Sequence, residues 1–263
     1  MKKTLVLVFV FLSVFTIAQP NKQLPPGTVK VEENLFLDIT EISNASWMEY
    51  RNWLRKKYGE NSQEYLSSAL DTNVWRDKLR YNEPYVKYYH SHPAYKEYPA
   101  VGMSYEQAIA YCKWRSDRVN ELYFVKENKL KLHPDSNYVF PEKVKYRLPT
   151  KAEWEKYAAV GMDIKTLLKA KKQNHELYNY LREEVANETT KSIDVTAPVK
   201  SYYPDKNGIY NILGNVAEMV QEKGIAKGGS YIHKIEEINP QKDFMYDAPK
   251  SYIGFRCVAE YID

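Results

Sequence analysis

The sequence predicts a mixed α+β fold, because three segments carry the start signals and spacing of helices while the rest consists of short strands and turns. The helical segments begin near Ser43, Ser104 and Thr150. The remaining chain has turn signals such as Gly208 and the glycine pair at 228–229. No stretch repeats with a period of about 20 to 50 residues, so we expect neither a solenoid nor a propeller.

The first 18 residues are typical of a secretory signal. Lys2 and Lys3 precede an apolar run from Leu5 to Ile17, and Ala18 supplies a small residue at a cleavage point. This run is too short for a stable membrane span, and no other segment is apolar for long enough to be one. We therefore expect an exported protein without an integral membrane span, located in the periplasm or at the cell surface.

Residues 19–30, QPNKQLPPGTVK, are rich in proline and polar side chains and are predicted to be a flexible lead-in. The folded domain is expected over residues 31–263, with ordered structure beginning at the apolar run around Leu35. Removal of Lys2 and Lys3 lowers the formal charge from +4 to +2. Nucleic acid is an unfavoured partner, because binding a polyanion requires a concentrated basic surface.

The first helix is predicted to begin at Ser43 or Asn44, either of which can act as the N-cap, and to stop at Gly59. Between these signals, aromatic and aliphatic residues recur at helical spacing: Trp47, Tyr50, Leu54 and Tyr58.

Two further helices are predicted from capping boxes. The second starts at Ser104, where Gln107 completes the box, and runs to about Leu122. The third starts at Thr150, where Glu153 gives the same pattern ahead of an apolar face.

Three strings follow one another in the second half of the chain. They are YRLPTKAEWEKYAA at 146–159, GIYNILGNVAEM at 208–219 and KGGSYIHKIEEINPQKDFMYDAPKSYIGFRC at 227–257. Together they resemble the formylglycine-generating enzyme (sulfatase-modifying factor) family, and the resemblance runs from about Leu35 to Val258. It implies the fold of that family, a C-type-lectin-like mixed α+β domain with little regular secondary structure.

Active members of the resembled family bind copper(I) through two cysteines soon after the KGGSY segment. The matching positions here are His233 and Ile238. Copper(I) is a soft ion that favours paired thiolates, so no copper is expected and no catalytic residue is assigned. An enzyme with altered metal chemistry, centred on His233, is a less favoured alternative.

The resemblance also implies one calcium site. Its ligands are the side chains of Asn211 and Glu218 and the backbone carbonyls of Gly214 and Val216. Calcium takes about six to eight oxygen ligands, which this set and water can supply. The alternative is that Gly214 makes a turn while Glu218 forms an ordinary salt bridge.

A second calcium site of the family is expected to be lost. Its asparagine persists as Asn179, but its acidic ligand matches Lys191, and an ammonium group cannot coordinate calcium.

The chain has two cysteines, Cys112 and Cys257. An even count in an exported protein favours a disulfide, and the resemblance implies that these two positions pair. The alternative is a pair of free buried thiols. No cysteine precedes Cys112, so a lipid anchor on an N-terminal cysteine is not expected.

Two departures from the family pattern resemble a non-catalytic branch, the accessory lipoproteins of gliding motility and type 9 secretion. One is an insert at about residues 116–145, ahead of the RLPT segment, and the other is a tyrosine-rich stretch before the second helix. The leading hypothesis is therefore a non-catalytic exported protein that acts in cell-envelope assembly, gliding motility or type 9 secretion. Its 24 tyrosines offer contact area for envelope partners.

A lectin-like module is the alternative from another functional class. It would bind a peptide or glycan in a cleft lined by Tyr231, His233 and the insert. His90 and His92 are a less favoured metal pair, since no third ligand is identifiable.

Overall fold

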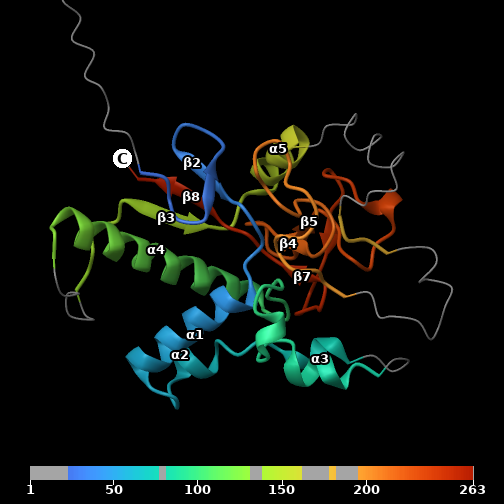
Figure 1. Ribbon diagram of the computed structural model, residues 1–263, viewed down its shortest axis with the longest axis horizontal. Coiled ribbons are helices and arrows are strands. Elements are labelled where there is room, and N and C mark those ends of the chain that lie inside the picture. Colours follow the sequence, from blue (N-terminus) through green and yellow to red (C-terminus); the bar gives the residue numbers. More distant parts are fainter. Residues whose placement is uncertain (1–22, 77–80, 131–137, 162–177, 182–194, 263) are drawn as a thin grey trace, which may run out of the picture.

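The computed structural model describes residues 23–76, 81–130, 138–161, 178–181 and 195–262, which form two small sheets with helices beside them (Figure 1). The strands are β1 (Thr28–Lys30), β2 (Leu35–Asp38), β3 (Val144–Arg147), β4 (Ala217–Met219), β5 (Ile225–Lys227), β6 (Phe244–Met245), β7 (Ile253–Gly254) and β8 (Val258–Tyr261). The helices are α1 (Asn44–Tyr58), α2 (Gln63–Leu66), α3 (Glu83–Tyr88), α4 (Tyr105–Glu127) and α5 (Lys151–Gly161), with short 3₁₀ helices at Thr72–Trp75, Pro93–Tyr95 and Ile235–Glu237. Mixed helix and sheet with modest regular structure confirms the predicted fold class.

The first sheet joins the two ends of the domain. Its order is β1-β2-β8-β3, antiparallel throughout, with Phe36 of β2 opposite Ala259 of β8. The second sheet has the order β6-β5-β4-β7, in which only the β4–β7 pair is parallel. The chain passes from the second sheet to the first between β7 and β8, which places Arg256 at the crossing.

The start of the domain differs from the sequence prediction. Thr28–Lys30 form β1, so ordered structure begins before Leu35, inside the predicted lead-in. Val29 pairs with Leu37 of β2. Pairing with a neighbouring strand stabilises β1, and the local composition of residues 28–30 does not predict that pairing. The predicted signal at 1–18 lies outside the described residues.

Local signals start the three predicted helices as expected. In α1 the Ser43 hydroxyl accepts from Ser46 N, and Gly59 ends the helix with φ of 97°. In α4 both halves of the Ser104–Gln107 capping box are present. Thr150 and Glu153 likewise exchange hydrogen bonds at the start of α5. Within the described ranges, no helix is both long and apolar enough to cross a bilayer.

The first twelve residues of the predicted insert at 116–145 belong to α4, which extends to Glu127 rather than to Leu122, and its last two residues open the edge strand β3. Ser116 donates its hydroxyl to the Tyr146 carbonyl and accepts from Tyr146 N, while Asn120 bonds both the N–H and the carbonyl of Val144. Ser116 and Asn120 are four residues apart on a helix, and Tyr146 and Val144 are two residues apart on a strand, and these two spacings are similar in length. The two side chains of α4 therefore form hydrogen bonds with the backbone at the outer edge of β3. Unpaired sheet edges promote aggregation, which this arrangement prevents.

Aromatic side chains fill much of the core between α1, α4 and the crossing at residues 255–257. Trp47 stacks on Tyr111 with ring centroids 5.5 Å apart, and Phe255 packs edge-on against both rings. A smaller cluster forms around Trp75 and the fully buried Tyr89. Large rigid rings therefore fill the space between elements that are individually short.

Candidate functional site

A buried ion pair lies where the two sheets meet. The Arg256 guanidinium, whose side chain is 0% exposed, donates to Glu218 of β4, with Nη2–Oε1 at 2.6 Å and Nε–Oε2 at 2.7 Å. Trp154 of α5 donates its indole N–H to the same carboxylate at 2.8 Å. Arg256 also donates to the backbone carbonyls of Asp38 and Tyr210. Both oxygens of Glu218 are therefore engaged within the protein.

A second buried carboxyl group, Glu41, is held by two asparagine amides. Asn215 Nδ2 lies 2.7 Å from Oε1, and Asn211 Nδ2 lies 3.3 Å from Oε2. Burial raises the pKa of Glu41 to about 8, although Arg256 acts to lower it. Arg256 balances the charge of Glu218, and Glu41, with its raised pKa, keeps its proton near neutral pH.

Sequence reasoning missed Glu41 and Arg256. The available signal was a charged residue inside an apolar run, as in the segment IGFRCVA that contains Arg256. A charged residue in an apolar run is buried together with its neighbours, and a buried charge requires a partner of opposite charge.

The residues predicted to bind calcium lie in this centre, and all are buried: Asn211, Gly214, Val216 and Glu218. Asn211 Oδ1 has no hydrogen-bond partner, which leaves an oxygen of the kind that calcium prefers. Glu218 forms the salt bridge considered as the alternative, with Arg256. Of the predicted donors, Asn211 fits calcium through its free oxygen, while Arg256 and Trp154 already bond the oxygens of Glu218 and would compete with a cation for them.

The turn that carries this set is sterically constrained. Gly214 has φ of 74°, and a Cβ atom there would lie 2.4 Å from the Asn179 carbonyl oxygen. The Asn179 side chain donates to Val195 O and to Asn215 Oδ1, so it joins the same buried amide network. Lys191, expected at the second calcium site, lies outside the described residues.

The two positions that match the copper cysteines lie in a packed environment. His233 Nδ1 is 2.8 Å from Ser230 Oγ, and its ring lies against Phe244 at a centroid distance of 4.3 Å. Burial lowers the pKa of His233. Ile238 is buried, with its Cγ1 close to Gly229. Among the described residues, no three His, Cys, Asp or Glu side chains come together as a metal site.

The sequence matches the model of one protein family. The sulfatase-modifying factor enzyme 1-like domain matches residues 7–261, almost the whole chain. The chain belongs to this family.

Two curated proteins are similar to this family member at low identity. The formylglycine-generating enzyme of Mus musculus is 22% identical over 302 aligned residues, covering 95% of this chain and 73% of that protein. The formylglycine-generating enzyme of Bos taurus is 25% identical over 197 residues, covering 63% of this chain and 45% of that protein. The bovine match thus spans less than half of the relative.

Among solved structures, the crystal structure of CarF is similar, with a TM-score of 0.50 and 19% identity over 87% of each chain. This similarity shows a shared fold. The assignment to a gliding or type 9 secretion branch of the sulfatase-modifying factor family stays a prediction.

The two histidines considered as a metal pair each have a structural partner. His90 Nε2 lies 3.0 Å from the Val101 carbonyl oxygen. His92 Nδ1 accepts from Ala94 N and caps the short helix at Pro93–Tyr95. Neither contact involves the other histidine, and each ring serves the local backbone.

His90 is expected to make the protein sensitive to mild acid. Burial lowers its pKa from 6.5 to about 4, so the unfolded chain binds a proton that the folded chain excludes. Above pH 6.5 His90 is neutral in both states, so it does not lower the free energy of unfolding. As the pH falls from 6.5 to 4, the free energy of unfolding decreases by about 1.4 kcal/mol per pH unit, or about 3 kcal/mol in total. Urea unfolding at several pH values measures this slope.

The control is His90→Gln, whose amide can still donate to Val101 O. Its unfolding free energy should fall less steeply than that of the parent between pH 6.5 and 4. An unchanged slope would rule out His90 as the titrating group.

The predicted cysteine partners lie side by side. Cys112 and Cys257 are both buried thiols, with Sγ atoms 3.5 Å apart. A disulfide bond is about 2.05 Å long, so these atoms are in contact without being bonded. Their pairing stays a prediction, because proximity allows the bond but does not form it.

The tyrosine-rich segment divides between core and surface. Tyr89 is fully buried and Tyr85 is partly buried, whereas Tyr81 is 78% and Tyr88 41% exposed. The segment therefore both fills the core and presents rings to solvent.

The cleft considered for a lectin-like module includes residues 131–137 of the insert, which lie outside the described residues. Tyr231 is buried and hydrogen-bonds Ser251. A cavity of about 870 Å³ lies beside α4 and residues 138–147, but neither Tyr231 nor His233 lines it. The packing of Tyr231 into the core separates it from the described part of the insert.

Proposed function

We propose that this member of the sulfatase-modifying factor family is a non-catalytic exported protein that acts in assembling a cell-envelope apparatus for type 9 secretion or gliding motility. The pair His233 and Ile238 carries the proposal. These positions supply an imidazole bonded to Ser230 and a buried aliphatic side chain where copper(I) requires two thiolates. Fold membership alone does not carry an activity.

Exposed aromatic rings support a role in recognition. Tyr81, Tyr88 and Tyr203 all present a large part of their rings to solvent. Tyrosine is enriched at protein interfaces because its ring and hydroxyl serve apolar and polar contacts together. Tyr81 lies just before α3 and Tyr88 is its last residue, which favours this segment as a contact surface.

The test is cross-linking of tagged protein in whole envelopes, followed by identification and stoichiometry of what co-purifies. Stoichiometric secretion or gliding components are expected, with recovery reduced by Tyr81→Ser/Tyr88→Ser and retained with Tyr203→Ser. Recovery of the protein alone, under conditions that capture a known complex, would overturn the assembly role. Conversion of a cysteine peptide to formylglycine by purified protein with copper(I) would overturn the non-catalytic role.

We also propose that the buried centre binds one calcium ion through Asn211, Glu218 and the carbonyls of Gly214 and Val216. The unpartnered Asn211 Oδ1, beside the buried carboxyl group of Glu41, supports a cation there. A ligand that binds only the folded state at 100 times its Kd stabilises it by about 2.7 kcal/mol. Thermal unfolding in calcium chloride should therefore occur at a higher temperature than in a chelator.

The controls compare the calcium response rather than the absolute stability. Asn211→Ala should abolish the difference between calcium and chelator, whereas Asn207→Ala, on a nearby turn, should keep it. Equal unfolding temperatures of the parent protein in calcium and chelator would contradict the calcium site. The reading of Glu218 as an ordinary salt-bridge residue would then stand.

A further inference from the structure

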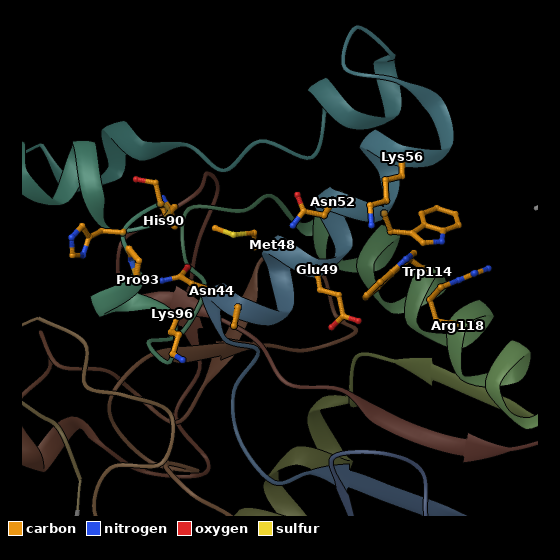
Figure 2. A pocket seen from close by; sticks show the side chains of 14 residues that line it. Asn44, Met48, Glu49, Asn52, Lys56, His90, Pro93, Lys96, Trp114 and Arg118 are labelled. Carbon is orange, nitrogen blue, oxygen red and sulfur yellow. The ribbon is translucent and has the colours of Figure 1, made fainter. Parts of the chain in front are cut away.

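A groove of about 700 Å³ runs along the outer face of α1 (Figure 2). Met48, Asn52 and Lys56 lie along its floor at four-residue intervals, which places them on one face of the helix. The segment at 90–96 forms the wall at the Asn44 end of the groove, and Trp114 and Arg118 of α4 lie at the Lys56 end. The first and last lining residues of α1 are about 18 Å apart along the helix, so an extended peptide of about six residues matches the groove in length.

The charges of this groove favour an acidic ligand. Lys96 lies toward one end, and Lys56 and Arg118 lie toward the other (Figure 2). Arg118 pairs with Glu121, which offsets its charge. Both lysines are exposed, and the acidic side chain that faces them within the groove is Glu49. Two separated cations suit carboxylates spaced along an extended chain better than a single compact anion.

Unpaired polar atoms gather around the same groove. Four lining residues each have a buried polar atom without a hydrogen-bond partner: Asn44 Oδ1, His90 Nδ1, Trp114 Nε1 and Arg118 Nε. Buried polar atoms in folded proteins are nearly always paired with protein, water or ligand. These atoms have almost no accessible surface, so the preference for a peptide rests on the charges and the exposed apolar floor of the groove rather than on bonds to them.

The aromatic residues of the groove favour a peptide over a glycan. Sugar recognition uses an open aromatic face, but the Trp53 ring has Lys57 Nζ at 4.8 Å and the Arg118 guanidinium carbon at 4.6 Å from its centroid. Trp114 is largely buried against Tyr50 and Tyr111. The exposed apolar surface on the floor is instead the flexible Met48 side chain, which adapts to varied apolar groups.

We propose that this groove binds an extended acidic peptide segment of a partner protein, with an apolar side chain against Met48 and carboxylates facing Lys56 and Lys96. The identity of that partner as an envelope component rests on the proposed function, whereas the groove itself does not. Tyr88 packs edge-on against His92, so one of the exposed tyrosines adjoins the same wall.

The test uses purified protein and fluorescent, end-capped hexapeptides rich in Asp, Glu and Leu, with binding measured by anisotropy. Acidic peptides should bind, and a matched set with lysine in place of the acidic residues should not. Lys56→Glu/Lys96→Glu and Met48→Asp should each weaken binding at least tenfold. Lys206→Glu, the same charge change on an exposed turn, should leave affinity unchanged.

Three outcomes would overturn the inference. They are equal binding of acidic and basic peptides, binding of acidic peptides that survives Lys56→Glu/Lys96→Glu in a folded protein, and selective binding of glycans in the same assay.

The envelope experiment separates this proposal from the proposed assembly role. If envelope components still co-purify with Lys56→Glu/Lys96→Glu, the groove is excluded as their contact while the assembly role stands. If peptides bind this groove but no component co-purifies, the assembly role fails and the groove stands.

Discussion

Replacing Arg256 with methionine is expected to destabilise the folded protein by about 3–5 kcal/mol, because it leaves Glu218 charged and buried without a counter-ion. The substitution also removes the donors to the Asp38 and Tyr210 carbonyls. Because Asp38 belongs to β2 and Glu218 to β4, the loss weakens the contact between the two sheets. Reversible urea unfolding, monitored by tryptophan fluorescence, measures the change.

Two further variants identify the cause. Arg55→Met breaks an exposed pair with Glu60 and should change the unfolding free energy by no more than about 1 kcal/mol. Arg256→Met/Glu218→Gln removes the uncompensated charge while keeping an acceptor for Trp154, and should recover part of the loss. If Arg256→Met stays within about 1 kcal/mol of the parent, the buried pair does not hold the sheets together.

Oxidation of Cys112 and Cys257 to a disulfide is expected to stabilise the protein by up to about 5 kcal/mol. The residues are 145 apart in sequence, and a bond across so long a loop removes much of the entropy of the unfolded chain. Burial raises the pKa of the Cys257 thiol, which disfavours the reactive thiolate in the folded state. We therefore expect the bond to form during folding in oxidising buffer rather than after it.

Thiol counting and urea unfolding test this together. Protein refolded under oxidising conditions should have no free thiol and should lose stability when a reductant is added. Cys112→Ser/Cys257→Ser should resemble the reduced parent and show no response to reductant. Two free thiols after oxidative refolding would contradict the pairing and support free buried thiols.

The helix starts and the family could be predicted from the amino-acid sequence. Ser43, the Ser104–Gln107 pair and the Thr150–Glu153 pair act on backbone groups within one turn, so their effect is visible in the local sequence. The three strings at 146–257 were enough to identify the family, which the domain match confirms. The same strings indicated which residues to inspect for calcium and copper.

The contacts of those residues could not be predicted from the sequence, because they form between segments that are far apart in the chain. Glu41 meets Asn211 and Asn215 across 170 and 174 residues, and the side chains of α4 meet the edge of β3 after a long insert. Such contacts depend on how the sheets bring distant segments together, for which no local spacing rule exists. The groove beside α1 arises in the same way, because Lys56 and Lys96 line one cavity only when the segment at 90–96 packs against the start of the helix.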